Sequence, residues 1–198
     1  MSELVRRLWV PVLAVALVHV AITIGRRWLG DEVVAAPEPS GAMMVAAGGP
    51  LEDLAIQFHR PGAEIFLEVY RQLFGALDPK TTVHVVVADP TDREIFEEAR
   101  LRWAAQDGEG PRVRYAVVGR PITSWARDRL AVLEPIGRGP LTILAPPSPM
   151  TGPEARGNDW LVPWTLRDHL GSGAELARAP FRFEGGDLVA DQDHVYVA

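Results

Sequence analysis

Two short stretches that are rich in acids hold the residues whose types could do chemistry. The first is WARD, residues 125–128, in which Trp125 and Arg127 precede the carboxylate of Asp128. We expect a strand to begin here, with Trp125 and Arg127 on one face and Asp128 on the other. An acid beside a tryptophan at a strand entrance is well placed to meet a flat cation. The alternative is that Asp128 only pairs with a neighbouring arginine at the surface, an interaction worth little.

The second stretch is EGGD, in which Gly185 and Gly186 separate the carboxylates of Glu184 and Asp187. Paired glycines permit backbone conformations, or a close approach of another group, that other residues forbid. The alternative is that Glu184 merely ends a strand and Asp187 is a turn acid. The following DQDH, residues 191–194, is better taken as a turn than as a metal site, because a calcium loop needs a longer series of ligands.

Taken together, WARD followed downstream by EGGD resembles the guanidine-modifying, or pentein, superfamily. Its members include agmatine deiminases, arginine deiminases, dimethylarginine hydrolases and amidinotransferases. The first motif is most similar to agmatine deiminases and the peptidylarginine type, whereas the second is more similar to arginine deiminases and dimethylarginine hydrolases, so the subfamily stays open. The resemblance covers residues 81–198 and implies an α/β fold, a partial propeller with about half of the family's five α/β modules.

The resemblance also implies a ligand, either a small guanidinium compound such as arginine or agmatine or the side chain of a peptidyl arginine. A guanidinium is planar, always charged and rich in donors, and carboxylates bind it best in bidentate geometry. By similarity, Asp128 and Glu184 would bind this group. The residues that would shape the site are Trp125, Arg127, Gly185, Gly186 and Asp187. No metal and no cofactor is implied.

The sequence departs from the family at the catalytic residues. In the family a cysteine thiolate attacks the guanidinium carbon and a histidine moves protons, but this chain contains no cysteine. The family's histidine and cysteine lie well downstream of the paired glycines, so neither His169 nor His194 is assigned that role. We therefore expect the N-terminal part of a C–N hydrolase, a deiminase or amidinotransferase, that is inactive as it stands. A half-propeller pseudoenzyme, acting as a non-catalytic guanidinium-binding or interaction module tethered to a membrane, is the alternative.

An uncharged apolar run near the start of the chain predicts a membrane segment. It extends from Leu8 to Ile24, the short end of what spans a bilayer, and lies between the arginine pairs 6–7 and 26–27. A cleaved signal peptide is the rival interpretation, but a basic pair directly after the run is unusual for a cleavage region. We expect a single-pass anchor with the bulk of the chain outside the cytoplasm. The net charge of −6 argues against a nucleic acid as partner.

The elements that must position these residues can be outlined from periodicity and composition. An anchor over residues 1–29 and an Ala/Pro/Gly-rich linker over 30–50 are expected to precede one α/β domain, residues 51–198. Its first helix, within 51–77, has an apolar stripe predicted at Ile65, Val69, Leu73 and Leu77, widened by Phe66 and Tyr70.

The rest of the domain is predicted to alternate strands and helices. A helix that starts at 90, with Thr91 as its N-cap, should lie between two strands. Two strands joined by a Gly-rich turn and an irregular excursion with one short helix follow, and then a strand and a hairpin. The first strand, the helix and the second strand are expected at 81–89, 90–108 and 113–119. The two strands with their turn fall within 130–147, the short helix at 164–170, the single strand at 181–184 and the hairpin at 187–198.

Overall fold

The computed structural model describes residues 42–44, 51–135, 139–147, 154–184, 188–190 and 195–197, all of which belong to one unit, residues 36–198. The predicted membrane segment from Leu8 to Ile24 lies outside the described residues, so the anchor and the signal peptide both stay predictions. Among the helices that are described, none combines the length and the apolar character needed to cross a bilayer.

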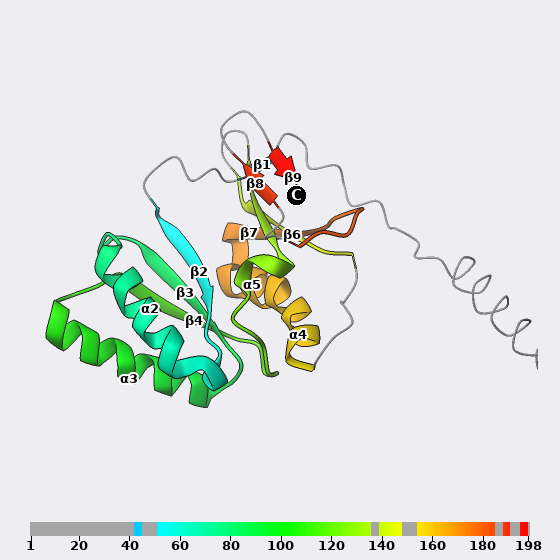
Figure 1. Ribbon diagram of the computed structural model, residues 1–198. Helices are drawn as coiled ribbons and strands as arrows, with labels where there is room; N and C mark the ends of the chain where they lie inside the picture. Colours follow the sequence, from blue (N-terminus) through cyan, green and yellow to red (C-terminus); the bar gives the residue numbers. More distant parts are fainter. Residues whose placement is uncertain are drawn as a thin grey trace, which may run out of the picture. The chain divides into compact units, whose positions relative to one another are not determined.

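The first sheet consists of three parallel strands in the order β2-β3-β4 (Figure 1). Parallel neighbours need a crossover connection, and here each crossover is a helix. The helices α2 and α3 lie side by side and connect the strands in turn, with a short 3-10 helix, η1, ahead of α2. The bounds are β2 Asp53–Gln57, η1 Arg60–Gly62, α2 Ala63–Ala76, β3 Thr82–Val87, α3 Pro90–Asp107 and β4 Arg112–Val117.

The central strand β3 is buried on both of its faces. Val83, Val85 and Val87 pack into the cluster formed with α2 and α3, whereas Val86 packs into a second cluster on the opposite face. Side chains alternate between the faces of a strand, and a parallel strand covered on both sides reads as a continuous apolar run. This explains why residues 81–89 were predicted correctly as a buried strand.

Phe96 of α3 forms the centre of the first cluster. It is fully buried, and its ring centroid lies 5.4 Å from that of Phe58 and 5.8–6.2 Å from those of four other aromatic rings, which include Tyr70 and Phe74. Offset and edge-to-face contacts of this kind stabilise a core beyond the area they bury.

The second sheet has the order β1-β5-β6-β7 and combines an antiparallel hairpin with a parallel crossover. The crossover from β6 to β7 is a helical run of four elements, and a separate antiparallel pair, β8 with β9, follows it. The bounds are β1 Ala42–Met44, β5 Ala131–Pro135, β6 Leu141–Ala145, α4 Glu154–Asn158, η3 Asp159–Leu161, α5 Val162–Leu170, η4 Gly171–Gly173, β7 Ala174–Arg178, β8 Leu188–Ala190 and β9 Val195–Val197.

Helix α5 packs against both sheets. Its buried residues Val162 and Leu166 share one cluster with Val86 of β3 and Ile143 of β6. Within the described residues, the two sheets are therefore linked by packing on α5 and share no ladder of backbone hydrogen bonds. The mixed α/β class, the β5–β6 hairpin and the β8–β9 hairpin are confirmed, and the half-propeller stays a prediction.

Several details of the sequence interpretation are wrong. The stripe predicted on α2 is wrong at Ile65 and Val69, which are 72% and 54% exposed. Its other members pack into or against the first cluster, together with Phe74, which was not predicted: they are Phe66, Tyr70, Leu73 and Leu77. The N-cap of α3 is Asp89, not Thr91: its carboxylate accepts from the backbone N–H of Asp92 at 3.0 Å, as an N-cap acid does.

The strand content was also misjudged at three places. Strand β2 was absorbed into the predicted first helix, and the predicted strand 181–184 has no strand structure, the strand being β7 instead. Strand β1 pairs with β5 inside the stretch that was expected to be only a linker. Three-residue strands are too short to leave a period-2 pattern.

Two histidines and an acid connect α5 to the first sheet. The ring nitrogens of His84 in β3 and His169 in α5 are 3.1 Å apart, and the other nitrogen of His84 lies 2.7 Å from the carboxylate of Asp53. Burial, and after it the charges of His84 and Arg114, lower the pKa of His169 below its ordinary value. The folded state therefore disfavours a charged His169.

We predict that truncating Phe96 destabilises the fold far more than truncating the exposed stripe of α2. Phe96→Ala should lower the free energy of unfolding by about 3–5 kcal/mol, because it removes buried contacts and leaves a cavity. Ile65→Ala should change it by no more than about 0.5 kcal/mol. Urea denaturation followed by circular dichroism measures both, and similar losses for the two variants would contradict this assignment of the buried face.

We also predict that acid weakens the fold through His169. Its pKa is lowered in the folded state, so the unfolded chain takes up the proton first as the pH falls below about 6.5. The free energy of unfolding should be greatest above that pH and decrease below it. Urea titrations at about pH 7.5 and 5.5 measure the difference, which His169→Gln should reduce. An unchanged pH dependence in His169→Gln would refute this role.

Candidate functional site

Asp128 lies in a short 3-10 helix, η2 (Ala126–Arg129), and not at the entrance of a strand as the sequence suggested. The backbone N–H of Asp128 donates to the carbonyl of Trp125 at 3.2 Å, which closes the turn. The predicted alternation of Trp125 and Asp128 between two strand faces is therefore wrong, because a 3-10 helix does not have the two-residue period of a strand. Strand β5 begins only after this turn.

The two acids that the sequence singled out converge on the guanidinium of Arg156, from helix α4. Arg156 Nη2 lies 2.6 Å from an oxygen of Asp128 and 3.5 Å from an oxygen of Glu184. The structure thus brings together residues that are far apart in the sequence, and it does so around a guanidinium group. The side chains of Asp128 and Arg156 are only 14% and 23% exposed.

A second arginine, Arg129, lies beneath Glu184. Its side chain is 1% exposed, and its Nη1 is 3.5 Å from the other oxygen of Glu184. The same Nη1 lies 3.4 Å from the backbone carbonyl of Asp128. Glu184 therefore has an arginine on each side, with one of its carboxylate oxygens facing each.

A third carboxylate, Asp159 of η3, is fully buried behind Arg156. It accepts three hydrogen bonds: from the backbone N–H of Thr123 at 2.8 Å, from the Thr123 hydroxyl at 2.5 Å and from the side-chain amide of Gln57 at 3.2 Å. Arg156 Nη1 is 3.9 Å from it, too far for a hydrogen bond. Asp159 thus fixes the backbone before η2 and adds negative charge to the site.

The alternative interpretation was that Asp128 only pairs with a neighbouring arginine at the surface, and one part of it, the pairing with an arginine, is observed. Asp128 does have an arginine partner, but this arginine comes from another element and the pair is largely withdrawn from solvent. Exposed pairs contribute little, whereas partly buried charges interact more strongly and must be satisfied by specific partners. The arrangement can hold a planar cation between carboxylates, which is the chemistry that the two motifs suggested.

The other predicted site residues are not brought to this centre by what is described. Trp125 is 62% exposed. The side chain of Arg127, and the residues Gly185, Gly186 and Asp187, lie outside the described part of the chain, so their roles stay predictions. Among the described residues, no three or more histidine, aspartate or glutamate side chains are arranged so that they could hold a metal ion.

Sequence reasoning missed the arginines and the third acid. Arg156 and Asp159 lie in a Pro- and Gly-interrupted stretch that was interpreted as an irregular excursion. Gln57 offered one signal in the sequence, because it is a polar residue directly after an apolar run. In the structure it is fully buried in β2, and a buried polar side chain needs hydrogen-bond partners.

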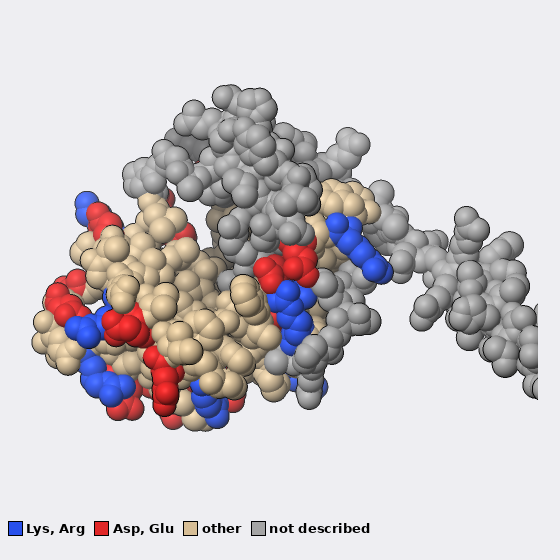
Figure 2. All heavy atoms as spheres, viewed as in Figure 1, with Lys and Arg blue, Asp and Glu red and all other residues tan. Residues whose placement is uncertain are grey.

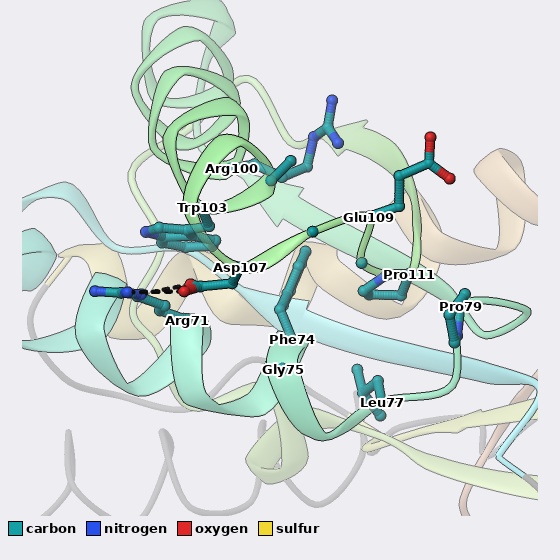
Figure 3. Close-up of a pocket in the computed structure, with 13 residues that line it drawn as sticks. Arg71, Phe74, Gly75, Leu77, Pro79, Arg100, Trp103, Asp107, Glu109 and Pro111 are labelled. Atoms are coloured by element: carbon teal, nitrogen blue, oxygen red, sulfur yellow. Dashed lines mark hydrogen bonds and ion pairs between the residues drawn. The ribbon is translucent and has the colours of Figure 1, made fainter.

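Charged side chains also gather away from this site. Figure 2 shows acidic and basic side chains adjoining over α2 and α3. A hollow of about 230 Å³ lies where these two helices end, and in Figure 3 the ion pair of Arg71 and Asp107, 2.8 Å apart, lies at its side. Phe74 and Trp103 also line it. None of the acids around Arg156 belongs to this hollow, so we place the candidate site at Asp128 and Glu184.

Comparison with known proteins supports the fold. No protein family and no curated protein matches the sequence. Among solved structures, agmatine deiminase from C. jejuni has a TM-score of 0.55 and 16% identity, and a cysteine-to-serine variant of it with substrate bound has 0.52 and 17%. Both matches cover 77% of this chain and 44% of the solved chain. At this identity the likeness shows a shared fold, over less than half of the longer chains.

We predict that Asp159 is a main determinant of stability around the site. Asp159→Ala removes the acceptor for three donors that are at least partly buried, each worth about 1–3 kcal/mol when left unsatisfied, so the loss should exceed about 3 kcal/mol. Asp168→Ala, an exposed acid in the same helical run, should change stability by less than about 0.5 kcal/mol. Thermal and urea denaturation compare the two, and equal losses would show that the buried hydrogen bonds contribute nothing special.

Proposed function

We propose that this protein binds a guanidinium group between Asp128 and Glu184. The observation that carries the proposal is the convergence of both carboxylates on the guanidinium of Arg156, at 2.6 and 3.5 Å. These acids come from η2 and from the segment after β7, so their meeting is a product of the tertiary fold. A carboxylate pair around a guanidinium supplies charge and directed acceptors for its planar array of donors.

The fold likeness to agmatine deiminase adds support from a separate direction. Agmatine carries a guanidinium, and one of the matched structures holds its substrate. A shared fold does not by itself determine function, so the proposal depends mainly on the positions of Asp128 and Glu184. The ligand class that we propose is a monosubstituted guanidinium, represented by agmatine, arginine and peptidyl arginine.

For the whole protein, the wider proposal is a deiminase- or amidinotransferase-like hydrolase to which this chain contributes the substrate-binding acids. The 198 residues contain no cysteine, so no thiol attack is assigned to any of them. The alternative is a binding module that uses the same acids without catalysis. The proposed anchor, from Leu8 to Ile24, would hold either form at a membrane with the described unit outside the cytoplasm.

Calorimetric titration of the full chain with agmatine and with arginine tests the proposal. Asp128→Asn should weaken binding about 10- to 100-fold, since hydrogen bonds to charged groups contribute about 1.5–3 kcal/mol. Glu184→Gln should weaken it less, because this acid is more exposed and lies at the longer distance. Asp107→Asn removes an acid that is likewise paired with an arginine, outside the site, and should have no effect.

Citrulline provides the matched ligand control. It has the length of arginine but ends in a neutral urea group, so a site that selects by charge should not bind it measurably. Binding of citrulline as tightly as arginine, or equal affinities for wild type and Asp128→Asn, would overturn the proposal.

A further inference from the structure

The guanidinium that Asp128 and Glu184 contact belongs to the protein itself. Arg156 Nη2 lies against one carboxylate oxygen of Asp128 and one of Glu184. A guanidinium ligand would use these same oxygens as acceptors. Its side chain is 23% exposed, so the group lies where solvent can still reach it. An incoming ligand and Arg156 therefore compete for the same oxygens.

The fit of Arg156 is incomplete, which matters for the competition. A bidentate pair between arginine and a carboxylate uses two parallel N–H···O bonds, but here the contact to Asp128 and the contact to Glu184 both fall on Nη2. The second terminal nitrogen, Nη1, is buried without a hydrogen-bond partner among the described residues, and Asp159 is 3.9 Å from it. A free guanidinium can orient itself to use donors that Arg156 leaves unused.

Charge balance opposes an empty site. Three carboxylates, those of Asp128, Glu184 and Asp159, lie within 4 Å of Arg156, and Arg129 also lies within 4 Å of Glu184. If Arg156 turned away with nothing in its place, these acids would lose a cation partner at a position that water reaches poorly. Replacement by another cation keeps the charge constant, whereas replacement by a neutral ligand does not.

From these observations, and on the premise of the proposed function, we propose that Arg156 is an internal occupant of the guanidinium site. An external guanidinium binds by displacing it, in a cation-for-cation exchange that lowers the apparent affinity and excludes neutral analogues. The apparent affinity equals the intrinsic affinity multiplied by the fraction of molecules whose site is open. If Arg156 fills the site in nine molecules of ten, its removal should tighten binding about tenfold.

The experiment compares agmatine binding by the full-length wild type, Arg156→Ala and Arg156→Gln. Both variants should bind agmatine about tenfold or more tightly than the wild type, and adding Asp128→Asn to either should abolish the gain. Arg71→Ala breaks an arginine–acid pair outside the site and serves as the matched control, with unchanged affinity.

Free guanidinium ion gives a second readout that does not depend on the ligand's tail. At about 10 mM, far below denaturing concentrations, it should raise the melting temperature of Arg156→Ala more than that of the wild type, while urea at the same concentration should not. If Arg156→Ala proves too unstable to titrate, a melting temperature that guanidinium restores still supports the proposal, and one that guanidinium leaves unchanged contradicts it.

The outcomes separate the two proposals. Equal agmatine affinity in wild type and both Arg156 variants, lost in Asp128→Asn, would overturn the role of Arg156 and leave guanidinium binding intact. Folded variants that bind no guanidinium compound at all would overturn the proposed function. Tighter binding that persists after Asp128→Asn would mean that Arg156 blocks a different site, and would also overturn the inference.

Discussion

One buried carboxylate, that of Asp159, determines the arrangement of the site. Three parts of the chain meet on it: the end of β2 through Gln57, the segment before η2 through Thr123, and the helical run that begins with α4. A carboxylate without solvent is tolerated only where donors satisfy it, and the donors here are a backbone N–H, a hydroxyl and an amide. Asp128 follows Thr123 closely and Arg156 precedes Asp159 by one turn, so both are positioned by these hydrogen bonds.

The site places its charges in layers. Arg129 and Asp159 are almost completely buried, Asp128 and Arg156 are mostly buried, and Glu184 is at the edge. The deeper charges are held in fixed positions by the fold, and the outer ones are exposed enough to exchange partners. Electrostatic interactions strengthen as water is excluded, so the mostly buried Asp128 attracts a cation more strongly than a fully exposed acid would. This is consistent with an acid-lined site in a chain whose net charge is −6.

The sequence predicted local patterns well and long-range contacts poorly. Strand β3 and helix α3 were evident because a continuous β-branched run and an amphipathic segment depend on nearby residues only. Strand β2 was missed because its pattern runs into that of the next helix. Asp128 and Glu184 were found through two short motifs, but Arg156 was not, since nothing in a Pro- and Gly-rich stretch indicates which distant acid an arginine will meet. Such contacts are fixed by how α5 packs between two sheets, which no local window contains.

The continuity of the helical run from α4 to α5 has a consequence for rate. No loop separates Arg156 from Val162, which is fully buried against both sheets. The backbone that carries Arg156 is thus tied to the core, and the part left to move is the arginine side chain itself. Rotamer changes of partly exposed side chains take picoseconds to nanoseconds, whereas segment motions take microseconds or longer. Exchange of partners at these acids would then proceed at the pace of ligand encounter, with no slow opening step ahead of it.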